Sequence, residues 1–143
     1  MDSKKGKSSR KDAWKLIWNS FNYTKMIVSV YVDGAGGEKS GFGFFVKETG
    51  ESFYEKKLGI TNNQAEYYAI ISALKKFQDS SEEIIIFSDS QNTVNQLNHE
   101  FSINNEQLRI LAQESWLLIP KIPKLQIKWI PRAENLAGKM LGS

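Results

Sequence analysis

The spacing of apolar residues along the chain predicts five strands and four helices in the order β-β-β-α-β-α-α-β-α. Short runs rich in β-branched and aromatic residues, ending at glycine or proline, are typical of strands. Apolar residues three and four positions apart are typical of one face of a helix. The predicted strands are residues 26–33, 41–48, 51–58, 84–88 and 125–130, and the predicted helices are residues 63–78, 90–98, 104–118 and 134–141.

This order of elements predicts the fold class. Strands joined by short turns come first, and strands that alternate with helices follow, so we expect an α/β domain with a mixed sheet and helices on both faces. The run Ile84–Phe87 is apolar without interruption, which favours a central strand covered on both sides. Trp116 and Trp129 occupy apolar positions and are expected in the core.

The first 25 residues differ from the rest of the chain in charge, with seven Lys or Arg against two Asp. Apolar residues there recur at helical spacing and predict a short amphipathic helix. They are Trp14, Ile17, Trp18 and Phe21, with Leu16 between them. That helix could dock on the domain, or the segment could hold nucleic acid by releasing counterions. A solvated tail is the third alternative. We divide the chain into a basic arm (residues 1–25) and a domain (residues 26–143).

Composition excludes several kinds of site. The 143 residues suffice for one domain. The chain has no cysteine, which excludes disulfides, thiolate zinc sites and a cysteine nucleophile, and its single His99 argues against a Ser-His-Asp triad. No apolar run reaches the ~18 residues of a membrane span, and no signal peptide is recognisable. We therefore expect no membrane partner and a cytoplasmic protein, with an organellar address encoded in the arm as the alternative.

Three acids stand at the ends of predicted elements. Asp33 ends the first strand, Glu66 lies in the first turn of the helix 63–78, and Asp89 follows the apolar run. Each has a structural alternative, namely a turn residue, an Asn63-x-x-Glu66 capping box and a helix N-cap. Together they can meet at one edge of the sheet, where their repulsion calls for a hard divalent cation such as Mg²⁺.

The sequence blocks that contain these acids resemble ribonuclease H of type 1. The blocks are Val-Asp-Gly-Ala (32–35), Thr-Asn-Asn-Gln-Ala-Glu (61–66) and Ser-Asp-Ser-Gln (88–91), in the order of that family, and the resemblance covers residues 26–141. It implies the ribonuclease H-like mixed five-stranded sheet, with three antiparallel strands followed by parallel ones. It also implies endonucleolytic cleavage of the RNA strand of RNA–DNA hybrids, with two Mg²⁺ or Mn²⁺ ions and 5′-phosphate products.

The resemblance also implies a role for individual residues. Asp33, Glu66 and Asp89 would hold the metal ions, with Asp33 between them. Arg132 would help the product and metal to leave. Amides can both donate to and accept from a ribose 2′-hydroxyl, the group that distinguishes RNA from DNA. The implied substrate-binding residues are Gly34, Asn62, Asn63, Gln91 and Asn135.

Two departures from the family pattern leave alternatives open. The family's fourth metal-binding Asp falls on Gly138 or Lys139, depending on the alignment, and the nearest acid is Glu134. The Lys-rich helix and loop of some bacterial relatives is also missing, so the basic arm is a candidate for gripping the substrate. The chain is thus a ribonuclease H, whole or impaired, or a hybrid-binding module that cuts weakly or not at all. A DNA-cutting, integrase-like relative is a third interpretation, and we expect a monomer.

Overall fold

The computed structural model describes residues 26–140. The basic arm and residues 141–143 lie outside the described residues, and with them the predicted amphipathic helix. Each predicted strand and helix of the domain is present. The elements are β1 (Ile27–Ala35), β2 (Gly41–Val46), β3 (Ser52–Lys56), α2 (Asn62–Phe77), β4 (Glu83–Ser88), α3 (Gln91–Leu97), α4 (Glu106–Leu118), the 3-10 turn η1 (Ile119–Lys121), β5 (Leu125–Trp129), the 3-10 turn η2 (Arg132–Glu134) and α5 (Leu136–Met140).

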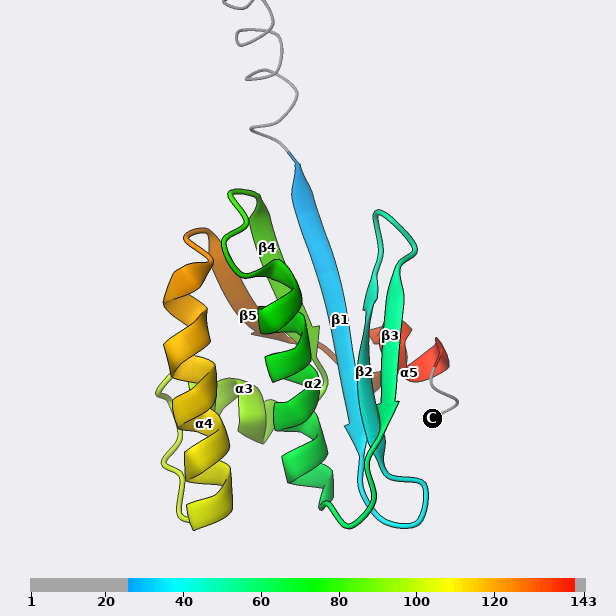
Figure 1. Ribbon diagram of the computed structural model, residues 1–143, viewed down its shortest axis with the longest axis vertical. Coiled ribbons are helices and arrows are strands. Elements are labelled where there is room, and N and C mark those ends of the chain that lie inside the picture. The colour runs from blue at the N-terminus through cyan, green and yellow to red at the C-terminus, as the bar shows by residue number, and fades with distance from the viewer. Residues whose placement is uncertain (1–25, 141–143) are drawn as a thin grey trace, which may run out of the picture.

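The five strands form one mixed sheet in the order β3-β2-β1-β4-β5 (Figure 1). Strands β1, β2 and β3 pair antiparallel, because short turns connect them. Strands β4 and β5 run parallel to β1 and to each other, because helices make the crossovers. The predicted α/β class and the mixed sheet are confirmed.

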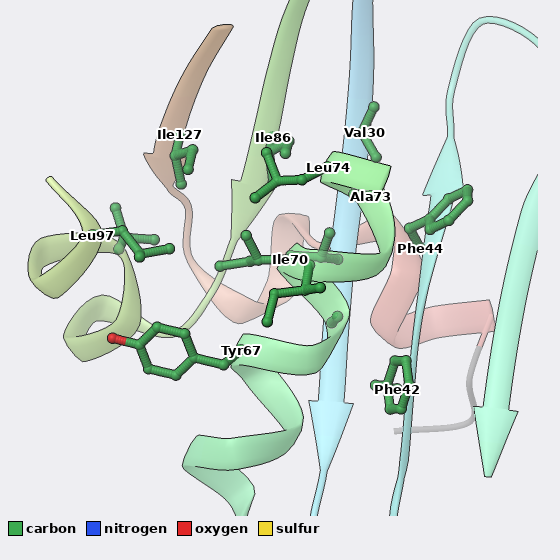
Figure 2. Close-up of a cluster of buried hydrophobic side chains, with 14 of the residues drawn as sticks. Val30, Phe42, Phe44, Tyr67, Ile70, Ala73, Leu74, Ile86, Leu97 and Ile127 are labelled. Carbon is green, nitrogen blue, oxygen red and sulfur yellow. The ribbon is translucent and has the colours of Figure 1, made fainter. Parts of the chain in front are cut away.

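Helices cover the sheet unequally. Helices α2 and α4 lie side by side on one face of the sheet (Figure 1), and α2 contacts β1 and β2. The short α5 contacts β1 and β2 from the other side. The main core lies between α2 and the sheet, where Val30, Ile70, Leu74 and Ile86 are fully buried (Figure 2). Burying each such side chain stabilises the fold by about 1.5–3 kcal/mol. Among the described residues, no helix has the length and apolar character needed to cross a membrane.

Two expectations about the core need correction. Strand β4 is interior to the sheet, but only its α2 side is closed: Ile84 and Ile86 are buried, whereas Ile85 and Phe87 are half-buried. Trp116 packs against the core as expected, but Trp129 is 45% exposed at the end of β5. An apolar residue type does not reveal which side of an edge strand is covered, because the covering element comes from elsewhere in the chain.

Candidate active site

The structure brings Asp33, Glu66 and Asp89 together. Each offers one carboxylate oxygen, and these three oxygens all lie within 4.8 Å of one another. Asp33 belongs to β1, Glu66 to α2, and Asp89 directly follows β4. Asp33 and Glu66 are buried, and Asp89 is half-buried. We call this group the carboxylate cluster. It sits at the carboxyl ends of the parallel strands β1 and β4, where α/β sheets bind ligands.

Gly34 allows α2 to reach the cluster. A Cβ added to Gly34 would lie 2.8 Å from the backbone nitrogen of Glu66 and closer still to the carbonyl group of Ala65. The backbone of the first turns of α2 therefore rests directly on β1, which only a residue without a side chain permits. The resemblance assigned Gly34 to substrate approach. The structure gives this glycine a second role, because it sets the distance between Asp33 and Glu66.

The N-terminal cap of α2 leaves the Glu66 side chain available. Thr61 is the N-cap: its hydroxyl accepts from the backbone N–H of Gln64, and the Gln64 side chain accepts from the backbone N–H of Thr61. This reciprocal capping box satisfies the helix start without Glu66. The alternative box between Asn63 and Glu66 is therefore wrong, and Glu66 points to the other two acids.

The electrostatics of Glu66 show how crowded the cluster is. Burial, and then the negative charges of Asp33 and Asp89, raise the pKa of Glu66 from 4.5 to about 9. A hydrogen bond from the backbone N–H of Gly34 and the charge of Arg132 oppose this rise. Among the described residues, the second carboxylate oxygen of Glu66, Oε2, is buried and has no hydrogen-bond partner. A buried polar atom of this kind is costly unless something outside the protein satisfies it.

Asp89 is held from the C-terminal part of the chain. The side-chain Nδ2 of Asn135 donates to Asp89 Oδ2 at 3.1 Å, and Trp129 Nε1 donates to the backbone carbonyl of Asp89 at 3.2 Å. The N-cap of α3 is Ser90, whose hydroxyl accepts from Thr93 N–H, so the N-cap alternative for Asp89 is wrong. The sequence carried no sign of the contact from Trp129, which was expected in the core.

Asn135 is buried, and its side-chain amide makes contacts within the domain. It is fully buried, its Nδ2 also donates to the carbonyl of Val32 at 2.9 Å, and its Oδ1 accepts from Ala137 N–H at 3.0 Å. Its amide is used by β1, by the carboxylate cluster and by the start of α5. Asn135 thus supports Asp89 through a hydrogen bond, and the substrate contact that the resemblance implies stays a prediction.

The other predicted residues lie on the surface of the domain. Asn62, Asn63 and Gln91 are exposed at the first positions of α2 and α3. The side-chain oxygen of Asn62 accepts from Gly36 N–H at 2.7 Å, which ties the loop after β1 to α2. Arg132 is exposed in η2, within electrostatic reach of Glu66. No described contact tests the substrate role of these side chains.

The described residues supply three acids to the cluster and no fourth. Glu134 is exposed in η2 and is not part of the group. Gly138, one of the two positions aligned with the family's fourth Asp, is buried in α5. The other position is Lys139, whose side chain lies outside the described part of the structure.

The donor set fits a hard divalent cation. Three carboxylates within 4.8 Å of one another repel, and a cation between them relieves that repulsion. The unpartnered Oε2 of Glu66 points to the same conclusion, because an oxygen–metal contact would satisfy it. With β1, α2 and β4 presenting acids in this way, the fold and the cluster define a protein of the ribonuclease H-like class.

Comparisons with known proteins agree with this class. The family model described as "Reverse transcriptase-like" matches residues 47–142, and the chain belongs to this ribonuclease H-like family. It is 30% identical over 123 residues to "Putative hydrolase EbsB" of Enterococcus faecalis, covering 80% of this chain and 90% of the relative.

Solved structures with the same fold include ribonucleases H1. The enzyme of Halobacterium salinarum is 28% identical with a TM-score of 0.72, covering 81% of this chain and 94% of its own. LC11-RNase H1, isolated from compost, is 25% identical with a TM-score of 0.68, and the match covers 80% of this chain and 91% of that enzyme's chain. A further structure of LC11-RNase H1, in complex with an RNA/DNA hybrid, aligns at 23% identity with a TM-score of 0.71, covering 80% and 92%, and shows the likeness of fold.

Proposed function

We propose that this protein hydrolyses the RNA strand of RNA–DNA hybrids endonucleolytically, with two Mg²⁺ or Mn²⁺ ions held by the carboxylate cluster. The observation that carries the proposal is the convergence of Asp33, Glu66 and Asp89, together with the unpartnered Oε2 of Glu66. The likeness to ribonucleases H1, one of them solved with an RNA/DNA hybrid, supports the same substrate.

The residues in and around the cluster would have different roles in the proposed reaction. When bound, a pair of divalent ions activates water and stabilises the leaving oxygen of a phosphodiester. Asp33, Glu66 and Asp89 would hold these ions through their carboxylate oxygens. Glu66 takes up a proton readily in the free protein and would lose it to bind a cation. Asn135 keeps Asp89 oriented, because it donates to one of its oxygens.

The rim of the cluster supplies groups suited to the RNA strand. Asn62 uses its side-chain oxygen on Gly36, which leaves its amide N–H groups as donors. Asn63, at the next position of α2, and Gln91, at the start of α3, are also exposed and can donate or accept. We assign these amides to ribose 2′-hydroxyls and the sugar–phosphate backbone. Arg132 would meet the phosphate of the substrate or the product, since its positive charge acts on Glu66.

A second candidate function follows from the number of acids. Among the described residues, the cluster has three carboxylates and lacks the family's fourth. Fewer ligands weaken the hold on a second cation, and a protein with one weakly held ion can bind a hybrid without cutting it. The alternative is therefore a hybrid-binding module of the same fold.

An end-labelled RNA–DNA hybrid separates the two functions. The intact chain is incubated with Mg²⁺ and then with Mn²⁺, beside Asp33→Asn and the control Glu38→Gln, an exposed acid in the loop after β1. The nuclease proposal expects RNA fragments with 5′-phosphates from the intact chain and the control, and none from Asp33→Asn. Retention of the hybrid without cutting in both metals would establish the binding module. If the intact chain neither cuts nor binds the hybrid, both functions are refuted.

Metal binding is measured independently of activity. A cation that binds only the folded protein at 100 times its Kd stabilises it by about 2.7 kcal/mol. We expect Mg²⁺ and Mn²⁺ to raise the melting temperature of the intact chain and of Glu38→Gln, but not that of Asp33→Asn. Equal shifts in all three proteins would show that the cations bind elsewhere.

A further inference from the structure

The face of the sheet opposite α2 carries a strip of apolar side chains. Tyr31 of β1 pairs with Phe45 of β2 and with Phe87 of β4, so these three rings form one row across three strands. Side chains two residues apart share a face of a strand, which places Ile27 and Ile85 on the same side as the row. We call these five residues the far-face strip.

The far-face strip remains partly open to solvent. Ile27 is 40% exposed, and the other members are half-buried. The rings of Tyr31 and Phe87 stack with their centroids 5.1 Å apart, so part of their burial comes from each other. Helix α2 packs on the opposite face of the sheet (Figure 1), where Val28 and Val30 belong to the buried core. Ser29 lies on the same face between Ile27 and Tyr31 and pairs with Ile85, so the strip is an apolar surface interrupted by one small polar side chain. Partly exposed apolar surfaces of this kind often receive another element.

We propose that the segment 13–21 of the basic arm docks on the far-face strip through its spaced apolar residues. These residues are Trp14, Ile17, Trp18 and Phe21, and they recur at helical spacing. The proposal is independent of the nuclease function, because it concerns a surface made by strands and not the carboxylate cluster.

The lengths of the two partners agree. Nine residues in a helix extend ~13 Å, and the four steps from Ile27 to Tyr31 along β1 also extend ~13 Å. Residues 22–26 join the segment to the strip, and five extended residues span up to ~17 Å, enough to reverse direction. The chain enters β1 at Ile27, which is itself a member of the strip, so docking requires no crossing of the sheet edge.

A competing surface exists on the other face. An apolar groove with a volume of about 490 Å³ lies between α2 and β3, lined by Phe42, Phe53, Tyr68 and Ser72 among others. Its middle is level with Val32, because Phe44, which also lines it, pairs with Val32. It thus begins farther along β1 from Ile27 than the strip does. The strip is the surface that the chain meets first.

Cysteine pairs test the placement, since the chain contains no other thiol. Ile17→Cys is combined with Ser29→Cys, in the strip between Ile27 and Tyr31, or with the matched Ser72→Cys in the groove. A short bismaleimide at low protein concentration avoids the strict geometry of a disulfide. We expect the intramolecular product of the Ser29 pair to form at least about tenfold faster than that of the Ser72 pair. Faster linkage to Ser72, equal rates, or only intermolecular products would overturn the proposal.

A second measurement needs no substitution inside the described domain. Ile17→Asp places a charge in the apolar set, whereas Asn19→Asp places the same charge outside it. Docking predicts that Ile17→Asp lowers the urea midpoint of the domain and that Asn19→Asp leaves it unchanged. Identical midpoints for both variants and the intact chain would show that the segment does not pack on the domain.

Discussion

Replacing Glu66 by Gln is expected to stabilise the metal-free protein at neutral and alkaline pH. The pKa of Glu66 is about 9 in the folded protein against an ordinary value of 4.5. Between these values the folded state holds a proton that the unfolded state has released. The contribution of Glu66 to the free energy of unfolding is therefore fully present below pH 4.5. It is lost as the pH rises toward 9. Gln carries no proton to lose and removes this dependence.

The size of the effect follows from one proton. A difference of one bound proton changes the free energy of unfolding by about 1.4 kcal/mol per pH unit. From pH 6 to pH 8 the intact chain should lose about 3 kcal/mol relative to Glu66→Gln, and relaxation of the cluster makes this an upper value. The cause is the burial of Glu66 beside Asp33 and Asp89, so a bound cation should cancel most of it.

The assay is urea unfolding at pH 6, 7 and 8, first with a chelator and then with saturating Mg²⁺. The intact chain is compared with Glu66→Gln and with Glu38→Gln, whose carboxylate is exposed. We expect the difference in free energy of unfolding between Glu66→Gln and the intact chain to widen with pH in chelator and to shrink when Mg²⁺ is added. The difference between Glu38→Gln and the intact chain should stay small. Parallel pH dependences of the intact chain and Glu66→Gln in chelator would refute the reasoning about Glu66.

Three further substitutions probe how the site is built. Gly34→Ala forces a Cβ into the backbone of α2 and should cost about 3 kcal/mol or more in urea unfolding, whereas Gly37→Ala, in open space at φ +86°, should cost about 1 kcal/mol; equal costs would contradict the close contact. Asn135→Ala removes three hydrogen bonds, two of them buried, and should cost about 2–4 kcal/mol by the same measurement, with weaker Mg²⁺ binding in calorimetry. Thr61→Ala removes the capping box and should cost about 1 kcal/mol, and an unchanged midpoint would show that the cap contributes nothing.

Much of the fold could be predicted from local patterns. The strands β1 to β3 and the helix α2 follow directly from alternation and helical spacing, and their ends differ from the prediction by a few residues. The capping of the α2 start was harder to predict, because Thr61, Asn63 and Glu66 could all take part in it. Only the packed structure selects Thr61 with Gln64. Trp129 was placed wrongly, because burial at a sheet edge depends on distant segments.

The three acids were recognisable because they belong to motifs with a family order, but their meeting was an expectation until the sheet was assembled. The role of Asn135 was not recognisable: it acts across 103 residues on Val32 and across 46 residues on Asp89. No local pattern records such a contact. The same holds for Gly34, whose lack of a side chain matters because α2 rests on it.

By itself, the sequence determined the elements, their order and the residue types able to hold a cation, since these depend on neighbours a few positions away. Only the tertiary structure decided that three carboxylates lie within 4.8 Å of one another, that Asn135 is buried as a support, and that one sheet face keeps an apolar strip. The reason is physical: pKa shifts, burial and hydrogen bonds between strands depend on distances in space, and strand pairing and packing set those distances.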